Sequence, residues 1–271
     1  MDVQFVKLSP TQNMTILVES PVERARQAEA AAALMAYESV YAEQVGFIEP
    51  PESAGAWARL QMAGGEFCGN ATMSLAAWLV WKKGEARGNA EVRVPLEVSG
   101  AEGIVECVIR PAGNDFLGTV RMPLPENMGE IDLPGGRFAA VEMPGITHVI
   151  VPAGALGNDP RAEASRLVPI WSGAIDAPAF GIVLYDEKTC RIDPLVCVKE
   201  LGSVVWERGC GSGSAALGAF EAARTGKDSL LRVAQPGGVI EVKSLYGAGA
   251  VRDIFITGKV ALAARGTAFW H

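Results

Sequence analysis

The sequence predicts an α+β protein of two similar halves, each a curled β-sheet or barrel around one central helix, with an active site in the cleft between them. Two segments, GGEFCGNATMSL and ERGCGSGSAALG, each place a cysteine, a glycine and small residues at the start of an almost uncharged helix. Cys68 and Cys210 are separated by about half of the 271 residues, and strand-like segments flank both. We therefore expect an internal duplication, with a first domain at residues 1–117, to which a C-terminal strand at 265–271 returns, and a second at 118–264.

Composition limits the classes of protein that fit. Hydrophobic residues make up 49% and charged residues 20% of the chain, a globular balance. The net charge of −7 argues against nucleic acid or an anionic membrane as a partner, and favours a small molecule. The N-terminal MDVQFVKLSP has no basic region followed by an apolar run, and the five cysteines suit free thiols in a reducing compartment. We therefore expect a cytoplasmic protein.

The first half is expected to begin with a strand and a helix. The apolar run MTILV predicts a strand at 14–18. Ser20, Pro21 and Glu23 have the residue types of the N-cap, N1 and N3 positions of a helix that should run through residue 38. Further strand-like segments follow at EQVGFIE, at WARLQM and from 92 to 121, with turns at Ser99-Gly100 and Gly113-Asn114.

The helix after Cys68 is too apolar to lie on a surface, so we expect sheet on most of its sides. In the second half Asp159 and Pro160 predict the start of a helix through RAEASRLVPIW, and a second apolar helix, AALGAFEAAR, follows Cys210. The expected strands of this half are THVIVP, FGIVLYD and PLVCV.

Cysteines at two helix starts suit acid–base chemistry. A helix N-terminus offers unpaired N–H groups and about half a positive charge, which bind a carboxylate and favour a thiolate. If both helix ends point at one carboxylate, the two sulfurs lie on opposite faces of the carbon that bears it. One sulfur could remove the α-proton and the other deliver a proton from the opposite side. The backbone N–H groups that would hold the carboxylate belong to Gly69, Asn70, Gly211 and Ser212.

Simpler interpretations compete for several residues. Cys107, Cys190 and Cys197 lie in strand-like runs and are expected to be small buried hydrophobic residues. CGSGS alone could cradle a phosphate, but it lacks the lysine of a P-loop and would leave the matching CGN unexplained. His148 lies in an apolar strand, where a structural role is favoured over a catalytic one. The sequence contains no metal-ligand cluster, and we expect neither metal nor cofactor.

These segments resemble the diaminopimelate epimerase and proline racemase superfamily, whose members use two cysteines without pyridoxal phosphate or metal. QNMTILV, AEQVGFIEPP, THVIVP and WERG are similar to that superfamily's GNDFVV, DQLLVVEPP, PHxV and ERG. The resemblance implies a diaminopimelate-epimerase-like fold. It also makes Asn13, Glu43, Gln44 and Glu207 candidate substrate-binding residues, with Glu207 on the α-ammonium.

Several motifs of this chain differ from those of diaminopimelate epimerases. The segments RLQMAGGEFC and GITHV lack the asparagines of those enzymes, and Cys210 directly follows Gly209. The chain therefore largely lacks the groups that would bind the second amino-acid end of diaminopimelate. NMTILV, EQVGFIE, EFCGNATMS, CGSG, QPGG and a late GK strand are instead similar to the histidine racemases of staphylopine-type opine metallophore synthesis.

The sequence thus predicts a cofactor-independent amino-acid racemase, with Cys68 and Cys210 as the catalytic pair and histidine as the favoured substrate. By the superfamily's habit we expect a homodimer. Two alternatives stay open: an epimerase or racemase of another amino acid, diaminopimelate included, and a non-catalytic or isomerising relative that acts as a binding module.

Overall fold

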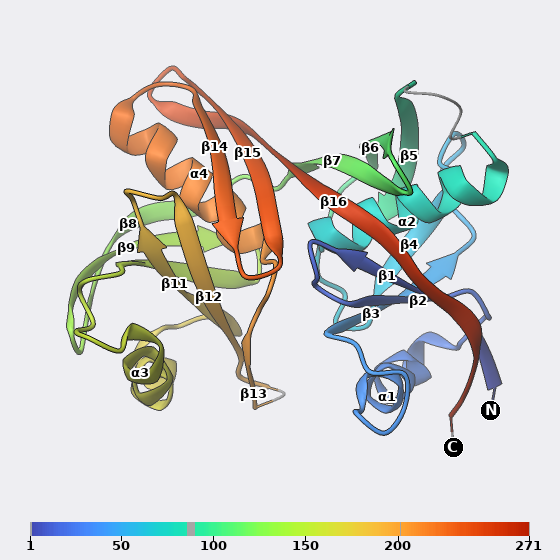
Figure 1. The fold of residues 1–271 in the computed structure, drawn as a ribbon, viewed down its shortest axis with the longest axis horizontal. Coiled ribbons are helices and arrows are strands. Elements are labelled where there is room, and N and C mark those ends of the chain that lie inside the picture. Colours follow the sequence, from blue (N-terminus) through green and yellow to red (C-terminus); the bar gives the residue numbers. More distant parts are fainter. Residues whose placement is uncertain (1, 86–89, 201, 271) are drawn as a thin grey trace. The chain divides into compact units, whose positions relative to one another are not determined.

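Four helices link pairs of parallel strands in the computed structural model, which describes residues 2–85, 90–200 and 202–270 (Figure 1). Adjacent parallel strands need a crossover segment, and each of these helices lies within such a crossover. The chain divides into unit 1, Met1–Arg121 with Thr257–His271, and unit 2, Met122–Ile256. Each unit contains two of the helices.

The described residues of unit 1 form a ring of eight strands. Its elements are β1 (Asp2–Pro10), β2 (Thr15–Val18), α1 (Arg24–Met35), β3 (Gln44–Glu49), β4 (Ala58–Met62), α2 (Gly69–Lys83), β5 (Val92–Val98), β6 (Ile104–Ala112), β7 (Asp115–Met122) and the last part of β16 (Ala250–Phe269). The strands pair in the order β1 to β7 and then β16. The antiparallel pairing of β16 with β1 closes the ring, so each of these strands has a neighbour on both sides.

Unit 2 repeats much of this plan. Its elements are β8 (Asn127–Leu133), β9 (Gly136–Met143), β10 (Ile146–Pro152), α3 (Pro160–Ala174), β11 (Ala179–Asp186), β12 (Arg191–Val198), β13 (Ser203–Trp206), α4 (Gly211–Thr225), β14 (Ser229–Gln235), β15 (Gly238–Gly247) and the first part of β16. The strands pair in the order β16, β15, β14, β12, β11, β10, β9, β8, and β13 pairs with β12.

The two units share one sequence of strand pairings. From β1 to β6 the pairs are antiparallel, parallel, antiparallel, parallel and antiparallel. The same order recurs along β9, β10, β11, β12, β14 and β15. The helices α1 and α3 fall in the first parallel crossover, and α2 and α4 in the second. The predicted duplication is therefore confirmed in the topology.

The second helix of each unit forms its core. α2 packs against β1 to β6, and its polar residues Asn70, Thr72 and Ser74 are buried along with its apolar ones. α4 packs against β9, β10, β14 and β15. A Cβ on Gly218 would lie 2.4 Å from Val242 of β15, so the missing side chain lets the helix approach the strand. The enclosure expected from the apolar sequences is confirmed for both helices.

The first helix of each unit covers a smaller apolar cluster. Leu34 of α1 packs with Ile16 and Phe47, and Trp171 of α3 packs with Phe180. Asp159 caps α3 as expected, because its side chain accepts a hydrogen bond from the backbone N–H of Ala162 at 3.1 Å.

The predicted start of the first helix is wrong. α1 begins at Arg24 after Glu23, whose side chain does not cap the helix within the described residues, and it ends at Met35 rather than at residue 38. The hydroxyl of Ser20 instead accepts a hydrogen bond from the N–H of Gln4 at 2.8 Å. A long-range contact with β1, a strand that the sequence analysis did not predict, occupies the side chain that the local pattern assigned to capping.

The domain boundaries and the location of Cys190 also differ from those predicted from the sequence. The domain boundaries lie at 121/122 and 256/257 rather than at 117/118 and 264/265. Residues 260–262 pair with β1, which brings this part of β16 into unit 1. Cys190 is not in a strand: it lies in the turn between β11 and β12 with φ 49°.

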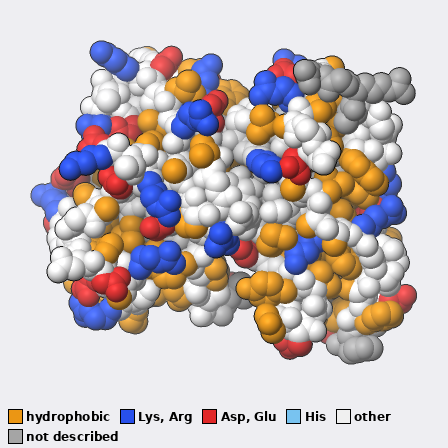
Figure 2. Space-filling model, in the orientation of Figure 1, with side chains coloured by type: hydrophobic (Ala, Val, Ile, Leu, Met, Phe, Trp, Pro, Cys, Tyr) orange, Lys and Arg blue, Asp and Glu red, His pale blue; other side chains and the backbone are white. Residues whose placement is uncertain are grey.

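The charged side chains are mixed on the face seen in Figure 2, where Lys and Arg alternate with Asp and Glu instead of gathering in one basic area. This mixed surface and the net charge of −7 do not favour a phosphate backbone as partner there.

Candidate active site

Cys68 is the N-cap of α2. Its backbone is extended (φ −130°, ψ 109°), and its sulfur accepts a hydrogen bond from the N–H of Ala71 at 3.4 Å. The hydroxyl of Thr72 donates to the carbonyl oxygen of Cys68 at 2.7 Å. The sulfur therefore lies at the positive end of the helix, where negative charge is favoured.

Cys210 begins α4 in the same way. Its backbone is also extended (φ −96°, ψ 107°), and its sulfur accepts from the N–H of Gly213 at 3.3 Å. The hydroxyl of Ser214 donates to the carbonyl oxygen of Cys210 at 2.6 Å. Each helix start thus has a cysteine at the cap, a sulfur bonded to the third helical N–H, and a hydroxyl at the fourth helical position.

A chain of polar contacts from the segments at β2 and β3 reaches Cys68 through Gln44. The Cys68 thiol donates to Oε1 of Gln44 at 3.0 Å, and Nε2 of Gln44 donates to the hydroxyl of Thr15 at 2.7 Å. Nδ2 of Asn13 donates to Glu43 at 2.9 Å. Asn13 is buried, and its Oδ1 has no hydrogen-bond partner among the described residues. Four of the residues singled out from the sequence are therefore brought together in unit 1.

Cys210 has a different environment. Its side chain is buried, and the charge of Glu207 acts on its thiol. Burial, followed by the charge of Glu207, raises the pKa of Cys210 well above its usual value. Both effects favour the neutral thiol of Cys210 over the thiolate. Burial also raises the pKa of Glu207.

His148 lies beside the Cys210 helix start. Its Nε2 is 3.0 Å from the hydroxyl of Ser212, and that hydroxyl is 3.6 Å from the sulfur of Cys210. The ring is fully buried, the part of the chain that the structure describes offers Nδ1 no hydrogen-bond partner, and burial lowers the pKa of His148 to about 4. The imidazole is therefore neutral at physiological pH. The sequence analysis did not foresee its contact with Ser212.

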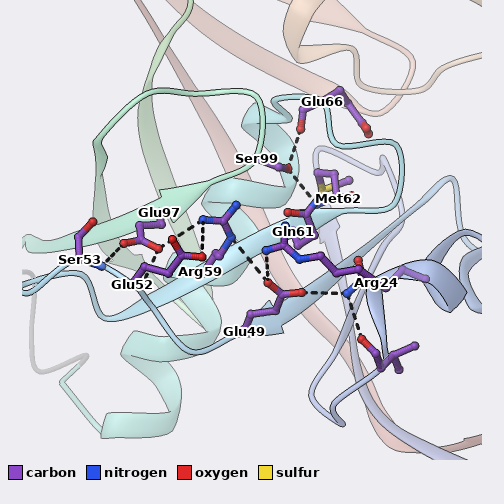
Figure 3. A network of polar contacts seen from close by, with 12 residues as sticks. Arg24, Glu49, Glu52, Ser53, Arg59, Gln61, Met62, Glu66, Glu97 and Ser99 are labelled. Atoms are coloured by element: carbon purple, nitrogen blue, oxygen red, sulfur yellow. Dashed lines mark hydrogen bonds and ion pairs between the residues drawn. The ribbon is translucent and has the colours of Figure 1, made fainter.

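A turn from a neighbouring strand holds the segment before Cys68 (Figure 3). The hydroxyl of Ser99 accepts from the N–H of Met62 at 2.9 Å and donates to the carbonyl oxygen of Glu66 at 2.9 Å. A Cβ on Gly100 would lie 2.2 Å from the backbone nitrogen of Phe67, so only glycine allows this approach. The turn after β14 does the same for Cys210: the N–H of Gly237 donates to the carbonyl oxygen of Arg208 at 2.7 Å.

A polar pocket of about 180 Å³ is lined in part by the Ser99 turn. Arg59 and Glu97 line it and form an ion pair at 3.6 Å (Figure 3). Hydrogen bonds from Ser53 and from the backbone N–H of Glu52 lower the pKa of Glu97 to about 2. The described lining carries two carboxylates, those of Glu52 and Glu97, against the single guanidinium of Arg59, and it includes none of the predicted catalytic or substrate-binding residues.

The remaining predicted residues occupy the first turns of the two helices. Gly69 and Asn70 are the first two residues of α2, and Gly211 and Ser212 are the first two of α4. Cys107 and Cys197 are buried in strands, as expected of small hydrophobic residues. Sequence reasoning missed Ser99 and the contacts of Gln235. QPGG was noted as a motif shared with the histidine racemases, and nothing local indicates which backbone groups its glutamine reaches.

Within residues 2–85, 90–200 and 202–270 no helix is long and apolar enough to cross a membrane. Among the same residues no group of three or more His, Cys, Asp or Glu side chains could hold a metal ion.

Comparison with known proteins identifies the family. The family model described as the histidine racemase CntK N-terminal domain matches residues 2–269. This chain belongs to the histidine racemase family. A histidine racemase of Fusobacterium nucleatum subsp. nucleatum is 31% identical over 265 residues, which cover 95% of this chain and 97% of that protein. One of Staphylococcus aureus is 32% identical over 273 residues, with coverages of 98% and 97%.

Solved structures similar to this histidine racemase family member confirm the predicted fold. A hydroxyproline epimerase from Agrobacterium vitis, with bound trans-4-hydroxy-L-proline, has a TM-score of 0.71 and 16% identity, and the match covers 100% of this chain and 93% of that one. A probable proline racemase from Agrobacterium radiobacter K84 has a TM-score of 0.68 and 17% identity, with coverages of 97% and 92%. The family model and the curated relatives, together with this shared fold, confirm the resemblance drawn from the sequence motifs.

Proposed function

We propose that this protein racemises free histidine at its α-carbon, with Cys68 and Cys210 as the acid–base pair and with no cofactor. The observation that carries the proposal is the repeated helix start, in which each sulfur accepts the third helical N–H. Family membership supports racemase activity and favours histidine as the substrate.

The reaction needs one thiolate and one thiol. The thiolate takes the α-hydrogen as a proton, and the electron pair left on the α-carbon delocalises into the substrate carboxylate. The thiol then gives its proton to the opposite face of the same carbon. One turnover inverts the centre and exchanges the protonation states of the two cysteines, so nothing is oxidised or reduced.

The environments of the cysteines favour an order of action. Burial and Glu207 oppose ionisation of Cys210, which suits it as the proton donor. Cys68 is only partly buried and bonds the neutral amide of Gln44, so it is the better first base. The N–H groups of Gly69, Asn70, Gly211 and Ser212 are in position to bind the carboxylate and the charge that develops on it.

The substrate side chain would be bound in unit 1. Asn13 donates to Glu43 and so orients that carboxylate, and Oδ1 of Asn13, which no described residue bonds, can accept from a ligand. A carboxylate is a good partner for an imidazole N–H, especially when the ring is protonated. Glu207, which is partly buried beside Cys210, would bind the α-ammonium common to all amino acids.

Two finer properties are also proposals. All five cysteines are free in the structure, which supports a reducing compartment, the cytoplasm. A homodimer is proposed from the superfamily's habit, and light scattering of the purified protein would test it. Synthesis of a histidine-derived opine metallophore would be the pathway that uses D-histidine.

A panel of L-amino acids in D2O tests the function. We expect the wild-type protein to exchange the α-hydrogen of histidine fastest and to accumulate its D-enantiomer. Exchange with another amino acid but not with histidine would reassign the substrate. No exchange with any amino acid would leave the binding-module alternative.

A further inference from the structure

We infer that Gln235 is a positioning residue for Cys210: its side-chain amide fixes the cysteine backbone so that the sulfur stays aligned for proton transfer. The inference rests on the proposed function, because it assigns Gln235 a part in the same reaction. Gln235 is the last residue of β14, and its side chain is buried.

Three hydrogen bonds form a closed circuit at the start of α4. The N–H of Cys210 donates to Oε1 of Gln235 at 2.7 Å, and Nε2 of Gln235 donates to the hydroxyl of Ser214 at 2.8 Å. That hydroxyl donates to the carbonyl oxygen of Cys210 at 2.6 Å. Both backbone polar groups of Cys210 are therefore bonded within the fold, and all three residues are buried.

The circuit replaces an ordinary capping device. In a capping box, a Glu or Gln at the third helical position bonds the N–H of the N-cap residue. Here the third position is Gly213, and a Cβ there would lie 3.1 Å from the sulfur of Cys210. A side chain at that position would crowd the reactive atom, so the glutamine comes from another strand.

The hairpin that carries Gln235 is itself tied to the cysteine segment. Gln235 pairs with Gly238 across a turn formed by Pro236 and Gly237. The N–H of Gly237 donates to the carbonyl oxygen of Arg208 at 2.7 Å. The hairpin thus bonds the chain both at Cys210 and two residues before it.

A neutral amide suits this place. Glu207 already opposes the ionisation of Cys210, and a second carboxylate against the cysteine backbone would oppose it further. Glutamine supplies both an acceptor for the N–H of Cys210 and a donor for Ser214 without adding charge.

The first test replaces Gln235 by methionine, which keeps the length of the side chain and removes both hydrogen bonds. A displacement of about 1 Å at a reacting group can cost about 100-fold in rate. We expect kcat for histidine to fall about 10- to 100-fold while KM changes less than about threefold. Gln27→Met is the matched control, because Gln27 is equally buried and its side chain bonds Val22 and Glu49 on the α1 side of unit 1. This control should leave kcat unchanged.

The second test uses Gln235→Glu and the pH profile. When protonated, the introduced carboxylic acid can make the same two hydrogen bonds as the amide, whereas its ionised form loses the donor and adds charge beside Cys210. The ratio of variant to wild-type kcat should therefore fall as pH rises. A ratio that is constant over about pH 6 to 9, or a kcat within about twofold of wild type for Gln235→Met, would overturn the inference.

A third measurement is independent of catalysis. Iodoacetamide labelling, mapped by mass spectrometry on the folded protein, should label Cys210 several times faster in Gln235→Met than in the wild type, with Cys68 unchanged. Gln27→Met should alter neither rate. Faster labelling of Cys210 in a protein that racemises nothing would keep the positioning role and reject the proposed function. Unchanged labelling of Cys210 would reject the positioning role whether or not the protein is a racemase.

Discussion

The starts of α2 and α4 have the same backbone plan and different side chains around the sulfur. In both, the carbonyl oxygen two residues before the cysteine accepts a hydrogen bond from a turn, from Ser99 in unit 1 and from Gly237 in unit 2. Cys68 is partly buried beside the amide of Gln44, whereas Cys210 is buried beside the carboxylate of Glu207. The duplicated scaffold places a sulfur at a helix N-terminus twice, and the neighbouring side chains give the two sulfurs different surroundings.

The largest expected effect comes from removing either sulfur. Cys68→Ser and Cys210→Ser should each lower kcat for histidine by about 10²- to 10⁴-fold, because a hydroxyl is a far weaker acid–base group than a thiol. Cys190→Ser is the control, since Cys190 lies in a turn between β11 and β12. Steady-state racemisation measures the effect. Retention of more than about a tenth of wild-type turnover by either helix-start variant would reject the two-thiol mechanism.

Variants of Glu43 and Glu207 should distinguish recognition of the substrate side chain from recognition of the groups common to all amino acids. Glu43→Gln should lower kcat/KM for histidine about 10- to 150-fold, since a charge-assisted bond is worth about 1.5 to 3 kcal/mol. It should leave slow α-hydrogen exchange of alanine nearly unchanged, while Glu207→Gln should lower both rates. Equal losses on histidine and alanine in Glu43→Gln would remove the main local support for histidine.

His148 should make the stability of unit 2 depend on pH. Because burial lowers its pKa from the usual value near 6.5 to about 4, the unfolded chain binds a proton in that interval that the folded chain does not. Its contribution to the free energy of unfolding is constant well above pH 6.5 and falls as the pH decreases towards 4. Between about pH 7 and pH 5 the loss should be about 2 kcal/mol.

Urea unfolding of the wild type and of His148→Gln at the same two pH values measures this contribution. The variant should lose less stability than the wild type over the same interval. Equal losses would show that His148 is protonated as readily in the folded protein as in the unfolded one.

The smallest expected effect comes from changing Ser99, whose turn bonds the segment that precedes Cys68. Ser99→Ala removes the partner of two backbone groups, those of Met62 and Glu66, and should cost about 1 kcal/mol of stability. Its kcat should fall less than that of Gln235→Met, because Ser99 bonds the segment before Cys68 whereas Gln235 bonds the backbone of Cys210 itself. A larger loss of kcat in Ser99→Ala than in Gln235→Met would reverse this ranking of the two turns.

Local patterns predicted the features that depend on local sequence. Cys68 and Cys210 were recognised as helix caps because a cysteine and a glycine precede an apolar run in each case. Ser20 was assigned wrongly, because the N–H that its hydroxyl bonds belongs to Gln4 of β1. The role of Gln235 could not be predicted either, since its partner Cys210 lies 25 residues earlier and no local signal links them. Contacts between segments distant in the sequence decide which side chains hold a reactive group in place.

Deuterium placement early in the reaction tests the two-thiol claim most directly. L-Histidine is incubated with the wild-type protein in D2O, and samples are taken before about a tenth of the substrate has reacted. The two enantiomers are separated, and the deuterium content of each is measured by mass spectrometry. Two thiols on opposite faces predict that the D-histidine formed carries deuterium at the α-carbon while the remaining L-histidine keeps its hydrogen. D-Histidine that keeps the original hydrogen, or L-histidine that gains deuterium as fast as D-histidine forms, would mean that a single base serves both faces and would contradict the account.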